Sequence, residues 1–116
     1  DRRRSLAAVY DAELAAIPNI VTPYVPNYGH HVYHLYVILA DNRDKLQQRL
    51  HEAGIGTGLH YPIPIHLQEA FADQGYRPGS LPVTEKVANS LLSLPMFPHM
   101  TDAQIEYVID AVRKSI

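Results

Sequence analysis

The chain has 116 residues, of which 47% are hydrophobic and 19% are charged, and this composition excludes an intrinsically disordered chain, which needs low hydrophobicity and high net charge. A net charge of -2 gives no strong field for nucleic acid, and the absence of cysteine excludes disulfides and thiolate metal sites. No apolar run reaches the ~18 residues that a membrane span needs. We therefore expect one globular domain that binds neither nucleic acid nor a membrane.

The first predicted element is an amphipathic helix over residues 4–17, which Pro18 ends. Its apolar side chains recur at helical spacing and are Leu6, Val9, Tyr10, Leu14 and Ile17. Because residues 1–4 already resemble the first turn of a helix, we expect the chain to be part of a longer protein. Prolines and a glycine make residues 20–29 irregular, and β-branched and aromatic residues predict a buried strand over residues 32–39.

A second helix follows Asp41 or Asn42, either of which can cap it, and this helix closes at Gly54. Residues 55–59 are short and spaced by glycines, so they could form a strand. Residues 67–74 are predicted to form a short helix.

A third helix is predicted over residues 82–92 with Pro82 in its first turn, and its inward face consists of Val83, Val87, Ala88 and Leu91. An extended segment over residues 93–100 follows. The last helix opens at Thr101, where Gln104 completes a capping box, and its apolar stripe consists of Ile105, Val108, Ile109 and Val112. Helices that alternate with a few short strands predict an α/β or α+β fold with a small sheet.

The segment most suggestive of chemistry is GIGTGLHYPIPIH, residues 54–66. Its glycines at alternate positions allow a close approach to the backbone, and His60 and Tyr61 follow at once. Prolines then make the backbone after Tyr61 rigid. Closely approachable backbone, a titratable ring with a phenol, and a rigid segment together indicate a binding site. A tight bend whose His and Tyr only cover the core remains the alternative interpretation.

Histidines also gather in GHHVYHLY, residues 29–36. On a strand, His31 and His34 would point to opposite faces, and no acidic or thiol partner stands at a ligand spacing. We therefore predict hydrogen-bonded histidines and no metal site.

At GIGTGLHYPIPIHLQ, residues 54–68, the chain resembles the carboxyl-terminal domain of the DegT/DnrJ/EryC1/StrS aminotransferases, which are sugar aminotransferases. Residues 33–38 resemble the family's characteristic strand, and residues 42–54 resemble the helix after it. Residues 93–113 resemble the family's ending, and residues 3–14 resemble the helix that links the large domain to the small one. The resemblance covers nearly the whole chain in the right order.

The resemblance implies the small domain of a fold-type I pyridoxal-phosphate enzyme, with short, mostly antiparallel strands packed against three to four helices. Residues 1–17 would be the interdomain linking helix and residues 18–116 the small domain, while the large cofactor-binding domain would lie upstream of Asp1. The parent is expected to be a cytoplasmic homodimer that moves an amino group from glutamate or glutamine to a keto sugar. That sugar is usually linked to a nucleotide, in polysaccharide, glycan or antibiotic sugar biosynthesis.

None of the lysines in this chain matches the family's Schiff-base context; they are Lys45, Lys86 and Lys114. We therefore expect no catalytic residue here, no binding of pyridoxal phosphate by the isolated chain, and no activity of the chain alone. The resemblance implies that the chain contributes to the wall of the substrate site, and the candidate residues are His60, Tyr61, His34, Tyr33 and His66.

Three other interpretations remain open: a non-catalytic interaction or dimerisation module derived from the family, an unrelated small metalloprotein, and a dehydratase relative. Surfaces that face the large domain or a second subunit would be exposed apolar patches. We expect such patches at Tyr10, Leu14 and residues 24–28.

Overall fold

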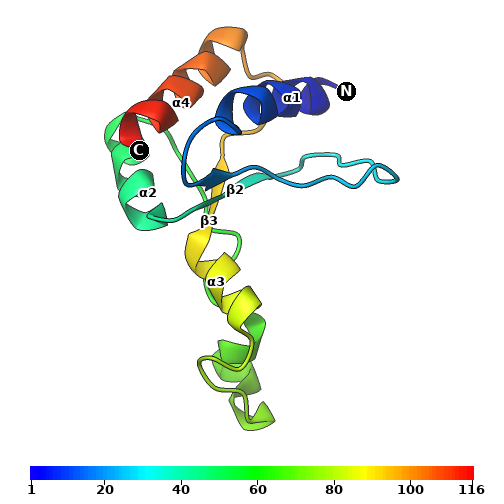
Figure 1. Ribbon diagram of the computed structural model, residues 1–116, viewed down its shortest axis with the longest axis vertical. Helices are drawn as coiled ribbons and strands as arrows, with labels where there is room; N and C mark the ends of the chain where they lie inside the picture. Colours follow the sequence, from blue (N-terminus) through cyan, green and yellow to red (C-terminus); the bar gives the residue numbers. More distant parts are fainter.

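The computed structural model describes all of residues 1–116 (Figure 1). Its helices and strands follow in the order α1 (Arg2–Leu14), β1 (Ile20–Val21), β2 (Tyr36–Ala40), α2 (Arg43–Glu52), α3 (Pro82–Ser90), β3 (Leu91–Leu94) and α4 (Asp102–Ser115). Two 3₁₀ helices, η1 (Ile65–Leu67) and η2 (Glu69–Gln74), stand where the sequence predicts one short helix. No helix is long and apolar enough to cross a membrane.

The strands form one three-stranded antiparallel sheet in the order β1-β2-β3, with β2 at its centre. The register places Tyr36 opposite Leu94 and Ile38 opposite Leu92. Alternate residues of β2 are fully buried, as expected for a strand with one face on the core. This small antiparallel sheet with its helices confirms the predicted fold class.

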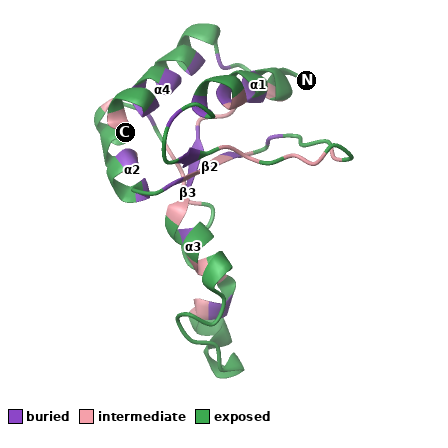
Figure 2. Ribbon diagram, in the orientation of Figure 1, coloured by how far each residue is buried: buried purple, intermediate pink, exposed green.

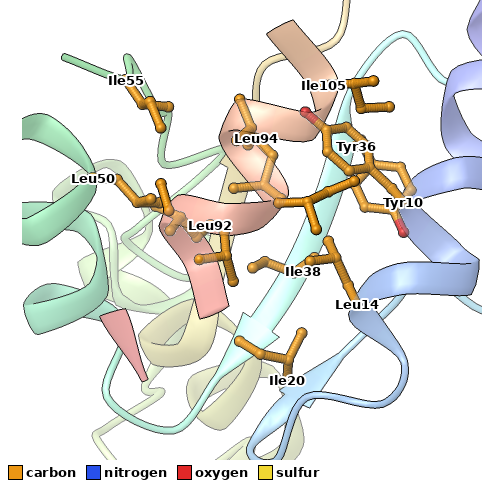
Figure 3. Close-up of a cluster of buried hydrophobic side chains, with 14 of the residues drawn as sticks. Tyr10, Leu14, Ile20, Tyr36, Ile38, Leu50, Ile55, Leu92, Leu94 and Ile105 are labelled. Atoms are coloured by element: carbon orange, nitrogen blue, oxygen red, sulfur yellow. The ribbon is translucent and has the colours of Figure 1, made fainter. Parts of the chain in front are cut away.

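Helices α1, α2 and α4 pack together around the sheet and bury one hydrophobic core (Figures 1 and 3). Figure 3 shows Tyr10 and Leu14 of α1 beside Tyr36 and Ile38 of β2. The predicted stripe of α4 is buried, and the capping box between Thr101 and Gln104 is present. The core therefore joins the first helix, the sheet and the last helix into one body.

Two expectations for α1 are wrong. Tyr10 and Leu14 were expected on an exposed patch, but both are fully buried because they pack into the core that α4 closes. Val9, expected on the inner face, is exposed. The neighbouring segment agrees better with the expectation, since Tyr24 and Tyr28 are 86% and 88% exposed.

Residues 61–90, here called the arm, project away from this body and carry η1, η2 and α3 (Figures 1 and 2). Within the arm only His66 and Ala88 are buried. Val83 and Val87 are exposed, contrary to the prediction, because this part of α3 lies outside the hydrophobic core, and Val87 lines an open groove of the arm. The arm is therefore a projecting segment with few buried side chains.

Two strand predictions also need correction. Residues 32–35 lie outside the sheet, and Tyr33 has a positive φ of 50°, which ends regular extended backbone before β2 begins. Residues 55–59 contribute a single bridge, between Gly58 and Ser93, in place of a strand.

Candidate functional site

The sheet register brings three distant segments together at one end of β2 and β3. Because Tyr36 pairs with Leu94, the residues just before β2 lie beside those just after β3. The bridge between Gly58 and Ser93 adds a third segment along the other edge of β3. Together they line an open hollow of about 230 Å³, here called the His34–His60 hollow, whose residues are His34, Leu35, Gly56, Thr57, Gly58, His60, Ser93, Leu94, Pro95 and Met96.

The His60 imidazole is held against the backbone of this bridge. Its Nδ1 lies 2.9 Å from the Ser93 hydroxyl oxygen. The Ser93 N–H donates to the Gly58 carbonyl at 2.8 Å, and the Gly58 N–H donates to the Ser93 carbonyl at 3.0 Å. A Cβ on Gly58 would lie 2.4 Å from Cε1 of His60, so only glycine lets the ring sit this close.

Arg3 of α1 holds the backbone of Tyr33, His34 and Met96 beside the hollow. One guanidinium nitrogen of Arg3 donates to the carbonyls of Tyr33 at 2.9 Å, His34 at 3.0 Å and Met96 at 3.2 Å. The Tyr33 N–H in turn donates to Nδ1 of His31 at 2.8 Å. The segment that carries His34 is therefore tied both to the first helix and to the segment after β3.

Behind the hollow, a cluster of tyrosines supports the sheet. The Tyr36 hydroxyl donates to the Asp11 carboxylate at 2.5 Å, and the Tyr10 hydroxyl donates to the Pro95 carbonyl at 2.9 Å. Burial, reinforced by the hydrogen bond to Asp11, raises the pKa of Tyr36 far above its usual range, and burial raises the pKa of Tyr10 as well. Both phenols therefore stay protonated and act as structural donors.

Residues 1–113 match the family model of the DegT/DnrJ/EryC1/StrS aminotransferase family. The chain belongs to this family. Its fold agrees, since a crystal structure of DesV from S. venezuelae in complex with a ketimine intermediate superposes with a TM-score of 0.94 at 42% identity, covering 97% of this chain and 30% of that one.

Curated relatives of this DegT/DnrJ/EryC1/StrS domain carry different names. The dTDP-3-amino-3,4,6-trideoxy-alpha-D-glucose transaminase of Streptomyces venezuelae is 42% identical over 97% of the chain. A protein named pleiotropic regulatory protein from Geobacillus stearothermophilus is 45% identical over 97% of the chain. The chain spans 30% and 31%, respectively, of the length of these relatives.

Of the residues predicted for the substrate wall, the structure of this family domain brings only His34 and His60 together. Tyr33 is buried in the core against Tyr36 and does not line the hollow. Tyr61 is 74% exposed and lines a separate groove of the arm. His66 is buried within the arm, where its Nε2 lies 3.4 Å from Oε2 of Glu85.

Sequence reasoning missed the residues that position the two histidines. Ser93 was assigned to an extended segment that resembles the family's ending, and its hydrogen bond was not predicted, although a polar residue within the apolar run LLSL is expected to need a partner when buried. Gly58 was noted for its backbone freedom but not for its contact with His60. Residues 1–4 were interpreted only as the first turn of a helix, and no local pattern reveals the three carbonyl partners of Arg3.

The residues of this chain do not by themselves fit pyridoxal phosphate. No lysine lines the His34–His60 hollow. Lys45 lines a different hollow with Asn19 and Asp41, Lys86 lies on α3 of the arm, and Lys114 lies near the end of α4. No group of three or more His, Cys, Asp or Glu side chains is placed to hold a metal ion.

Proposed function

We propose that this chain is the small carboxyl-terminal domain of a pyridoxal-phosphate-dependent sugar aminotransferase, with His60 and His34 in the wall of its substrate site. The proposal rests on the hollow, because both histidines line it although 26 positions of sequence separate them. Family membership and the names of relatives such as the S. venezuelae transaminase support the reaction class.

The geometry limits what this chain does in that reaction. A hollow of about 230 Å³ is smaller than the ~300–1,000 Å³ of complete small-molecule sites, so it suits one wall of a site. The Nε2 of His60 makes no hydrogen bond within the chain, which leaves it free to bind a sugar oxygen. His34, held through its own carbonyl by Arg3, would contact the same ligand.

The rest of the site would come from protein outside this chain. Pyridoxal phosphate supplies the electron sink for amino transfer when bound. The Schiff-base lysine, the phosphate contacts and the large domain would all belong to the remainder of a parent enzyme, in which residues 1–17 link the two domains. We further propose that the parent is a cytoplasmic homodimer, that glutamate or glutamine is the amino donor, and that the acceptor is a keto sugar linked to a nucleotide.

An isotope experiment on the full-length parent protein tests this proposal. The protein, loaded with pyridoxal phosphate, is incubated with dTDP-linked and UDP-linked keto sugars and with either [¹⁵N]glutamate or [amide-¹⁵N]glutamine. Mass spectrometry of the sugar nucleotide should show the incorporated ¹⁵N. Loss of water from the sugar without nitrogen transfer would instead establish a dehydratase. Binding of the sugar nucleotide without either reaction would establish a non-catalytic module.

A further inference from the structure

We propose that Ser93 is a positioning residue that holds the His60 imidazole in its Nε2–H tautomer, so that His60 presents a hydrogen-bond donor to an oxygen of the substrate. The proposal rests on the proposed function for the identity of that substrate. The tautomer itself follows from the contacts around Ser93.

Ser93 lies within β3 and is only 4% exposed. Its backbone N–H and C=O are both used by Gly58. The only hydrogen-bond partner of its hydroxyl is Nδ1 of His60, at 2.9 Å. The hydroxyl proton therefore has a single acceptor available within the chain.

The proton of a neutral His60 imidazole can lie on either ring nitrogen. A neutral imidazole carries its proton on one nitrogen and accepts hydrogen bonds at the other. When Nδ1 accepts from Ser93, the proton must be on Nε2. The opposite arrangement, with Nδ1–H donating to the serine oxygen, would leave a buried hydroxyl proton without an acceptor, which is unfavourable. The environment of Ser93 thus selects the Nε2–H tautomer.

Gly58 holds the ring in place on one side, because even a Cβ at this position would collide with Cε1 and Nδ1. His60 is otherwise exposed at the hollow, and its Nε2 has no partner within the chain. An Nε2–H there can bond a carbonyl, hydroxyl or phosphate oxygen, but it cannot accept a bond from an ammonium group. It therefore suits the oxygen-rich side of a keto sugar nucleotide.

Histidine nitrogen NMR on the full-length parent protein tests the tautomer without any need for activity. The protein is labelled with [¹⁵N]histidine, His60 is assigned through a His60→Gln variant, and spectra are recorded above pH 8. We expect a protonated Nε2 and an unprotonated Nδ1 in the wild type, and a mixture of tautomers in Ser93→Ala. A protonated Nδ1 in the wild type, or an unchanged pattern in Ser93→Ala, would overturn the inference.

Kinetics test the consequence for the substrate. We expect Ser93→Ala to lower kcat/KM for the keto sugar about tenfold, and Ser93→Thr, which keeps the hydroxyl, to recover most of it. Ser90→Ala is the matched control, because its hydroxyl donates to the Lys86 carbonyl in the arm. If amino transfer is absent but the Nε2–H tautomer is found, the proposed function fails and the assigned tautomer stands. If the tautomer changes in Ser93→Ala while kcat/KM does not, the role of His60 as a donor is refuted.

Discussion

Replacing Gly58 by alanine would test the position of His60 with the smallest possible change. The backbone of Gly58 is not in the left-handed region, so alanine fits its conformation. The new Cβ would lie 2.4 Å from Cε1 and 3.0 Å from Nδ1 of His60, whereas ordinary contact begins at 3.4 Å. The ring must therefore move by about 1 Å, which disrupts its hydrogen bond with Ser93.

The expected effect separates activity from stability. A misplacement of about 1 Å in a site costs about 100-fold in rate, or about 2.7 kcal/mol of transition-state stabilisation. Because His60 is exposed, its ring can swing outward, so unfolding free energy should fall by no more than about 1 kcal/mol, the value of one hydrogen bond. The assay is kcat/KM of the full-length parent with its keto sugar nucleotide, with thermal unfolding measured in parallel.

Two further variants make the experiment decisive. Gly29→Ala is the matched control, because Gly29 lies outside the hollow and its new Cβ would lie 3.2 Å from Cγ of Pro26, so its kcat/KM should stay close to that of the wild type. In a His60→Ala background, Gly58→Ala should add no further loss, because the ring with which it collides is gone. An active Gly58→Ala protein, or an equal loss in the His60→Ala background, would refute the reasoning.

Three further groups can be tested: Arg3 beside the hollow, Glu85 in the arm, and the lysine that binds pyridoxal phosphate. Arg3→Ala should lower the free energy of unfolding by about 2 kcal/mol in chemical denaturation, since three part-exposed carbonyls lose their charged donor. Arg4→Ala is the control and should change the free energy of unfolding by less than about 0.5 kcal/mol, because the only side-chain partner of Arg4 is the exposed Asp1. Equal effects of the two variants would contradict this prediction. Hydrogen bonds from the backbone N–H groups of Gly79 and, against the effect of burial, of Leu81 lower the pKa of Glu85. The stabilisation that Glu85 gives the arm is therefore present above the ordinary value of 4.5 and is lost as the pH falls through the lowered value. Amide hydrogen exchange in α3 should therefore become faster in acid, and Glu85→Gln should abolish this pH dependence. If exchange in the variant still becomes faster in acid, a group other than Glu85 causes the effect. Borohydride reduction of the full-length parent with pyridoxal phosphate, followed by peptide mapping, should label a lysine outside this chain. A label on Lys45, Lys86 or Lys114 would contradict this expectation.

Local patterns in the sequence were sufficient for the class of fold and for the last helix. The capping box at Thr101 and the stripe of α4 depend on neighbours in the chain, and both are confirmed. An amphipathic helix does not say what covers its apolar face, which is why Tyr10 and Leu14 were expected on the surface. Periodicity likewise placed Val83 and Val87 inward, because it cannot show that α3 belongs to a projecting arm.

The candidate site depends on contacts that sequence patterns do not report. His60 was singled out from its glycine- and proline-rich surroundings, and its role stays a prediction. Its partner Ser93 lies 33 positions away and meets it only through the bridge with Gly58. Tyr33 was grouped with His34 as a neighbour, but its positive φ places it in the core while His34 lines the hollow.

A comparison of two histidine variants tests whether this domain supplies His60 to the substrate site of a sugar aminotransferase. Amino transfer from labelled donor to keto sugar nucleotide is measured for the full-length parent, for His60→Ala, and for His51→Ala, whose exposed imidazole lies on α2 away from the hollow. We predict transfer by the wild type and by His51→Ala, and a kcat/KM at least about 100-fold lower in His60→Ala with pyridoxal phosphate still bound. No transfer by the wild type, or equal transfer by His60→Ala, would contradict the account.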